Sequence, residues 1–214
     1  MTPVREKIVA SESNLHLHTL PLGEWSTNCY VLTGGQESLI VDPAAEAESI
    51  LAAVAGTTVK AILLTHAHLD HLQALDQVRQ ATGAPLGLHP ADAAAFGVPG
   101  DFELADGAML SLGDSELRVV HTPGHTPGSV CLRFDRRAIV GDTLFPGGPG
   151  HSDKPEALAQ ILASLRDKVF TWPDDTIFYP GHGEGSTIGA VRPAFTAFLA
   201  RPRSPDLCGD VEWL

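Results

Sequence analysis

Residues 65–71 read Thr-His-Ala-His-Leu-Asp-His, and this segment decides the fold of the chain. It follows a short apolar run, Val59 to Leu64, that is typical of a buried strand. A helical pattern, with apolar side chains on one face, extends from Asp70 to Thr82. The sequence therefore predicts a tight loop between a buried strand and a helix, with the polar residues at its apex.

Three imidazoles and one carboxylate within six residues make this loop a candidate metal site. Neighbouring side chains diverge while the backbone curves, so one loop can offer ligands to two adjacent ions. Imidazole and carboxylate suit Zn²⁺, Fe²⁺ or Mn²⁺. A helix cap would explain the aspartate alone and would leave the histidines without a reason. The candidate ligands here are His66, His68, Asp70 and His71.

Three later segments place a histidine or an aspartate beside glycine where a predicted strand ends. Loops at strand ends are where ligands from separate strands can meet. Each segment is a weak signal alone, and together with the first motif they are strong. The segments are 122–129 (TPGHTPGS), 140–145 (VGDTLF) and 179–183 (YPGHG), with candidates His125, Asp142 and His182.

Strands and helices alternate along both halves of the chain, without a long linker or a fixed repeat. Two sets of strands, each with its helices, predict an α/β protein built as an αββα sandwich, in one domain over residues 1–214. The expected strands are 15–20, 29–32, 38–41, 59–64, 85–88, 117–120, 129–132, 138–140 and 176–179. The expected helices are 46–55, 70–82, 155–169 and 188–200, the last broken near Pro193, before an irregular tail.

Composition excludes several classes of protein. The formal net charge of −12 disfavours nucleic-acid binding. The three cysteines, Cys29, Cys131 and Cys208, are odd in number and widely spaced, so no disulfide framework is expected. No stretch reaches the ~20 apolar residues of a membrane span. The first twenty residues lack the apolar core of a signal peptide, so we expect a cytoplasmic protein.

The ordered motifs THAHLDH, GHTPGS, GDTLF and PGHG resemble those of the metallo-β-lactamase superfamily. Within it the chain is most similar to the glyoxalase II branch and its short bacterial relatives, over residues 15–200. The resemblance implies two mixed β-sheets flanked by helices. It also implies two divalent cations, Zn²⁺ first among them, with Fe and Mn as alternatives.

The resemblance assigns a role to each candidate. His66, His68 and His125 would bind the first metal, and Asp70, His71 and His182 the second. Asp142 would bridge the two, and Asp70 could also orient the attacking water. Open positions mark catalytic rather than structural metal sites.

The implied reaction is hydrolysis of a small acyl thioester, such as S-lactoylglutathione, by a metal-bound hydroxide. Glyoxalase II enzymes carry a C-terminal helical extension that binds glutathione, and here only residues 183–214 follow His182. The thiol carrier therefore stays open. The other histidines lack a motif; among them His151, nine residues after Asp142, lies on a loop expected to border the site.

Two other readings stay open. A persulfide dioxygenase of this fold would bind a single iron through positions matching His66, His125 and Asp142. The presence of His182, which would complete a second metal site, favours the two-metal hydrolase instead. A lactonase or a β-lactamase would use the same ligands. A non-catalytic scaffold would be expected to lack ligands, and all seven are present.

Overall fold

Two six-stranded β-sheets form the centre of the protein. The computed structural model describes residues 14–213; residues 1–13, part of the segment considered for a signal peptide, lie outside the described residues. In the first sheet, β1, β2 and β3 pair antiparallel, and β3 to β6 run parallel. Its strands, in spatial order, are β1 His16–Leu22, β2 Thr27–Gly34, β3 Glu37–Val41, β4 Thr58–Leu63, β5 Leu86–Leu88 and β6 Phe102–Glu103.

The second sheet is built from the later part of the chain. β10 and β13 pair in parallel, and all other neighbouring strands of this sheet pair antiparallel. Both sheets are therefore mixed, as expected. In spatial order its strands are β14 Ser186–Thr187, β13 Ile177–Pro180, β10 Arg137–Gly141, β9 Val130–Phe134, β8 Ser115–His121 and β7 Met109–Leu112. A separate two-stranded ribbon joins β11 Leu144–Phe145 to β12 Gly148–Pro149.

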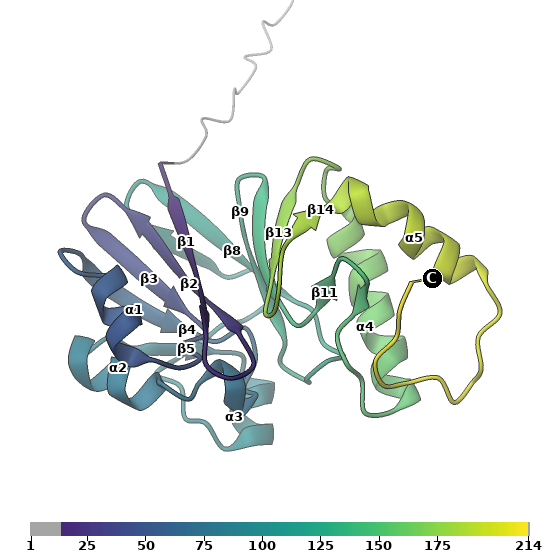
Figure 1. Ribbon diagram of the computed structural model, residues 1–214, viewed down its shortest axis with the longest axis horizontal. Coiled ribbons are helices and arrows are strands. Elements are labelled where there is room, and N and C mark those ends of the chain that lie inside the picture. Colours follow the sequence, from purple (N-terminus) through teal and green to yellow (C-terminus); the bar gives the residue numbers. More distant parts are fainter. Residues whose placement is uncertain (1–13, 214) are drawn as a thin grey trace, which may run out of the picture.

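Helices cover the outer face of each sheet (Figure 1). Against the first sheet lie α1 Ala47–Ala53, α2 Leu75–Thr82 and α3 Pro90–Phe96. Against the second lie α4 Pro155–Asp167 and α5 Ile188–Ala200, with the 3₁₀ turn η2 Val169–Thr171 after α4. The order helix, sheet, sheet, helix confirms the αββα sandwich.

Strands buried on both faces explain the continuous apolar runs in the sequence. Successive side chains of a strand point to opposite faces. In β2, Cys29 and Val31 pack under the helices, whereas Tyr30 and Leu32 pack between the two sheets. Three cores result, one under each helical layer and one between the sheets. The central core holds both sheets in one body.

Two predictions about helices are wrong. The helix expected from Asp70 begins at Leu75, and Asp70 lies in the separate 3₁₀ turn η1, Leu69–His71. Leu72, at φ −138°, ends that turn, and the amide of Ala74 bonds to the carbonyl of Pro43 instead of continuing a helix.

The second wrong prediction concerns Pro193, which does not break α5. The helix continues through this position, because the buried Val191, Phe195 and Phe198 pack it onto the second sheet. Proline removes a single helical hydrogen bond, and this packing outweighs the loss. Residues 202–213, the part of the tail that the structure describes, form no helix or strand, as expected. Among the helices formed by residues 14–213, none is long and apolar enough to span a bilayer.

Candidate metal centre

Four loops from both sheets bring the seven candidate residues into one cluster. The loop after β4 carries four of them, and the β8–β9 connection carries His125. Asp142 follows β10 directly, and His182 follows β13. Each loop begins where a strand ends, so the strands fix the positions from which the side chains extend.

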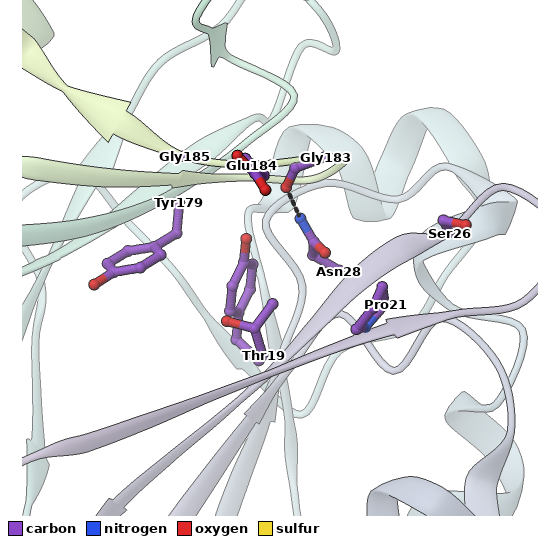
Figure 2. Close-up of a pocket in the computed structure, with 9 residues that line it drawn as sticks. Thr19, Pro21, Ser26, Asn28, Tyr179, Gly183, Glu184 and Gly185 are labelled. Carbon is purple, nitrogen blue, oxygen red and sulfur yellow. Dashed lines mark hydrogen bonds between the residues drawn. The ribbon is translucent and has the colours of Figure 1, made fainter. Parts of the chain in front are cut away.

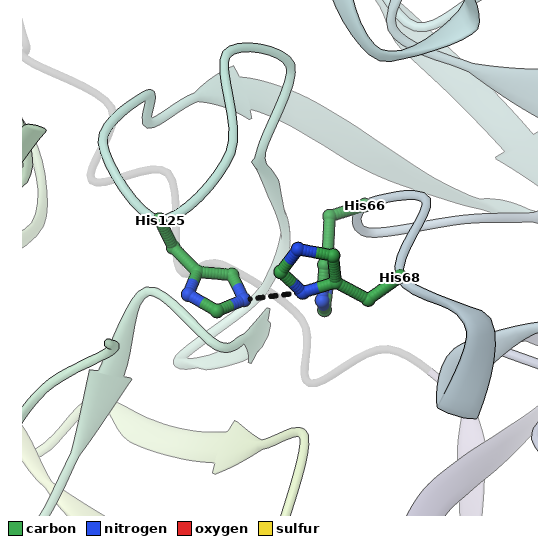
Figure 3. A group of neighbouring side chains, drawn as sticks. All are labelled: His66, His68 and His125. Atoms are coloured by element: carbon green, nitrogen blue, oxygen red, sulfur yellow. Dashed lines mark hydrogen bonds between the residues drawn. The ribbon is translucent and has the colours of Figure 1, made fainter. Parts of the chain in front are cut away.

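The first group of donors consists of His66, His68 and His125, whose ligand atoms lie within 4.8 Å of one another. Figure 3 shows the three rings facing one another from two separate loops. Nε2 of His125 is 2.9 Å from Nδ1 of His68. These are the three residues expected around the first metal.

The second group consists of Asp70, His71 and His182, again with ligand atoms within 4.8 Å. Oδ2 of Asp70 is 3.2 Å from Nε2 of His182 and 3.6 Å from Nε2 of His71. Thr27 donates its hydroxyl to the same carboxylate oxygen at 3.2 Å. These are the three residues expected around the second metal.

Asp142 lies between the two groups. Its Oδ1 is 3.4 Å from Nε2 of His71, and its Oδ2 is 3.6 Å from Nε2 of His182. The same Oδ2 is 3.7 Å from Nε2 of His125 in the first group. Asp142 therefore lies between the two groups, with its Oδ2 near a histidine of each group, a position that suits a bridging ligand.

The donor atoms fit a cation. In residues 14–213, the buried atoms without a hydrogen-bond partner include His66 Nε2, His71 Nε2 and Asp142 Oδ1, all of this cluster. Buried polar atoms are normally paired. Three unpaired polar atoms at one place therefore point to a group that binds there, and the fold with these His and Asp residues implies divalent metal ions.

Contacts behind the rings orient four of the histidines. Nδ1 of His71 faces the carboxylate of Asp42, and Nδ1 of His66 lies 3.1 Å from the hydroxyl of Thr65. The other two bond to carbonyl oxygens: His125 Nδ1 to that of His151 at 2.9 Å, and His182 Nδ1 to that of Trp25 at 3.2 Å. Such contacts fix the tautomer and leave Nε2 available as a ligand.

Electrostatics separates the two groups. Burial, together with the neighbouring His71 and His125, holds the pKa of His66 well below its usual range, so this ring is neutral. Burial also opposes charge on His71, but the carboxylates of Asp42 and Asp142 outweigh it and raise its pKa to about 10. The second group therefore attracts positive charge, whether that of a proton or of a cation.

Two buried aspartates that sequence reasoning missed support the cluster. Asp42 accepts from the amide of Thr65 at 2.7 Å and from its hydroxyl at 2.6 Å. Asp92 accepts from the amides of Ala67 and Gly128, at 2.9 and 2.6 Å, and from the hydroxyl of Thr126 at 2.8 Å. Asp42 ends a strand just before a proline, a signal that could have marked it; Asp92, in an alanine-rich helix, carries no such signal.

The loop that carries His182 is fastened to strand β2. The amide group of Asn28 donates to the carbonyls of Pro180 and Gly183, and the hydroxyl of Tyr30 donates to that of Pro180. A pocket of about 450 Å³ lies beside this loop (Figure 2). None of the seven candidates lines it; its walls are Thr19, Pro21, Ser26, Asn28, Tyr30, Tyr179, Gly183, Glu184 and Gly185.

His151 borders the cluster through its backbone. Its carbonyl accepts the bond from His125, while its exposed ring pairs with Asp210 at 2.8 Å and with Asp153 at 3.4 Å. The ring therefore belongs to a surface contact with the C-terminal tail, and the carbonyl is the part that acts on the site.

This fold and this cluster are those of a metallo-hydrolase. The family model of the metallo-beta-lactamase superfamily matches residues 22–182, and the chain belongs to that superfamily. A probable metallo-hydrolase, YqgX, of Bacillus subtilis is 36% identical over 191 residues, covering 79% of this chain and 90% of the relative. The hydroxyacylglutathione hydrolase GloC of Haemophilus influenzae is 32% identical, covering 82% and 94%.

Solved structures agree with this assignment. The BLEG-1 B3 metallo-beta-lactamase superposes with a TM-score of 0.72 at 32% identity, covering 82% of this chain and 95% of the other. ETHE1 from Myxococcus xanthus has a TM-score of 0.73 at 27% identity, covering 81% and 80%. TTHA1623 in a di-iron-bound form has a TM-score of 0.68 at 33% identity, covering 81% and 96%.

Proposed function

We propose that this protein hydrolyses acyl thioesters with two divalent cations held by the seven-residue cluster. The observation that carries the proposal is the position of Asp142, whose Oδ2 lies near a histidine of each of the two groups of donors. The relative named as a hydroxyacylglutathione hydrolase supports the thioester. Zn²⁺ is the proposed metal, with iron or manganese as alternatives, since His and Asp ligands suit all three.

The residues divide the work. His66, His68 and His125 would hold one cation, and Asp70, His71 and His182 the other, with Asp142 shared. Bound cations lower the pKa of water from about 15.7 toward 7 and so supply hydroxide at neutral pH. Asp70 is held by the Thr27 hydroxyl, which leaves its other oxygen to orient a water.

A thioester is a suitable substrate because its leaving thiolate is weakly basic and needs no strong general acid. The proposed catalytic unit is the whole sandwich as one domain, since its ligands come from loops of both sheets. We propose that it acts in the cytoplasm, a location that its three unpaired thiols support.

The test combines metal content with turnover. Elemental analysis of the purified protein is expected to find about two metals per chain. The protein is also expected to cleave S-lactoylglutathione, as measured by the loss of the thioester absorbance. His182→Ala should lose about one metal and most of the activity. His16→Ala is the matched control, because His16 is an exposed histidine on β1, outside the cluster, and it should behave as the wild type.

Other outcomes would contradict the proposal. One iron per chain, no thioester cleavage, and oxygen uptake with a persulfide would make the protein a dioxygenase. If the protein held two metals and cleaved a lactone or a β-lactam but no thioester, the proposed metal centre would stand and the proposed substrate would be wrong.

A further inference from the structure

Several exposed apolar residues lie on segments that adjoin the metal centre. Five large apolar residues are exposed within residues 14–213, and three of them adjoin the cluster. They are Trp25, Leu69 and Phe96, with 57%, 65% and 41% of their surfaces exposed. We call these three the apolar rim.

Each rim residue is joined to a different part of the cluster. Leu69 stands between His68 and Asp70 in the sequence, within the turn η1. The ring of Phe96 meets that of His68 edge to face, with centroids 5.4 Å apart. Trp25, in the turn between β1 and β2, accepts the bond from His182 through its carbonyl. The three rim residues therefore belong to segments beside both groups of donors.

Packing inside the protein does not explain why these three positions carry apolar side chains. None of the three belongs to the three buried cores. Exposed apolar surface costs free energy unless something covers it, and clustered patches mark binding sites. Beside a hydrolytic centre, the natural cover is the part of the substrate that continues from the reacting carbonyl.

We propose that the apolar rim binds the acyl chain of the substrate, so the enzyme prefers thioesters of apolar, hydrocarbon acids. This inference rests on the proposed thioester hydrolysis. Biological thiol carriers bear charged and amide groups, so the hydrocarbon of an acyl thioester lies in its acyl part. The acyl chain is accordingly the occupant that an apolar rim recognises.

The test is a series of N-acetylcysteamine thioesters from acetyl to octanoyl, given to the metal-loaded enzyme. A fully buried methylene corresponds to about a fourfold change in an equilibrium constant, and a half-covered one to about twofold. We expect kcat/KM to rise about twofold per methylene. Trp25→Ala and Phe96→Ala should flatten this dependence at unchanged metal content.

Binding is measured separately, with matching thioethers in which a methylene replaces the carbonyl. Calorimetry gives the affinity of each variant. In the wild type, Trp25 emission should shift to the blue as longer chains bind, because Trp172 and Trp213 are buried and report little. Met109→Ala is the control, since Met109 is equally apolar and exposed but lies on β7, away from the cluster.

The outcomes separate the two proposals. The role of the rim would be overturned if both the cleavage rates of the thioesters and the affinities of the thioethers were independent of chain length. That result would leave the proposed thioesterase activity intact. Thioethers bound more tightly with length by an enzyme that cleaves no thioester would support the rim and overturn the proposed reaction. Equal flattening in Met109→Ala would also overturn the role of the rim.

Discussion

Nδ1 of His71 lies 3.0 Å from Oδ2 of Asp42, and both side chains are fully buried. The same carboxylate accepts from the amide and the hydroxyl of Thr65, at the start of the loop that carries four candidate ligands. Asp42 itself has φ of 52°, in the left-handed region that aspartate tolerates better than most residues. One buried carboxylate thus holds the first residue of the loop in place and orients the ring of a candidate ligand.

Asp42→Asn should weaken the second group of donors. The Thr65 amide requires an oxygen at the Oδ1 position, so the new NH₂ must occupy the Oδ2 position and donate to His71 Nδ1. The ring would then carry its proton on Nε2, where it cannot bind a metal. We expect metal affinity at this group to fall about 10- to 100-fold. Titration against a competing chelator measures it.

The control for this variant is Asp114→Asn, because Asp114 is exposed in the turn between β7 and β8. It makes the same chemical change without touching the cluster. Equal metal affinities for the wild type and Asp42→Asn would refute the orienting role of Asp42.

Asp92→Ala should act on the first group instead. Its carboxylate joins the loop before His68 to the loop around His125, through Ala67, Thr126 and Gly128. Removal leaves the buried amides of Ala67 and Gly128 unpaired, and each costs about 1 kcal/mol or more, whereas the Thr126 hydroxyl keeps Ser129 Oγ as a partner. We expect the free energy of unfolding of the metal-free protein to fall by about 2 kcal/mol, measured by denaturant titration.

Metal binding distinguishes Asp92 from Asp42. Asp92→Ala should lower affinity for one metal while the Asp70, His71 and His182 group keeps the other. Asp76→Ala, at an exposed position of α2, is the control. Loss of stability without any change in metal affinity would restrict Asp92 to a structural role.

Gly181→Ala should disrupt the centre, although it lies outside the set of candidate ligands. A Cβ at this position would stand 1.9 Å from Oδ1 of Asp142 and 2.6 Å from Cε1 of His71. Neither group can move without leaving the cluster. We expect loss of most bound metal and of activity, with the circular dichroism spectrum retained.

Gly183→Ala is the matched control on the other side of His182. Gly183 has φ of +67°, but nothing lies within 4 Å of an added Cβ. Its cost should be the backbone strain of about 1 kcal/mol, visible in thermal unfolding and not in metal content. The prediction for Gly181 is wrong if the two variants bind metal equally well.

Asp106 gives a pH dependence away from the metal centre. It accepts from the amide of His121 at 2.8 Å and pairs with Lys168 at 3.0 Å. Burial opposes ionisation, but these two contacts outweigh it and lower the pKa of Asp106. Because the pKa is lower in the folded state, the ionised carboxylate stabilises the fold at pH values above the pKa of the unfolded chain, about 3.9.

Asp106→Asn should therefore lower stability at neutral pH. The side chain is 54% exposed, so the effect should be about 1 kcal/mol or less. The difference from the wild type should shrink as the pH falls below about 4. Denaturant titrations from pH 3 to 7, with chelator present so that metal release does not contribute, measure it; a difference that grows in acid would contradict the sign.

Much of the fold could be predicted because several of its strands, such as β2, β3 and β10, are buried on both faces. Runs such as 61–64 are apolar throughout, and the polar loop after this run carries four of the seven candidate ligands. Short elements escaped: α3 and the two-residue strands have too few residues to show a period. The start of α2 was misplaced because a contact with the distant Pro43, and not local propensity, ends the turn η1.

The sequence by itself determined which residue types could bind metal and that they follow strands, because both signals are local. The tertiary structure alone decided what holds them: Asp42 behind His71, Asp92 between two loops, and Asn28 on the carbonyl of Gly183. It also decided that Trp25 and Phe96 adjoin the cluster. The physical reason is that these contacts join residues distant along the chain, and strand pairing and packing, rather than local pattern, bring them together.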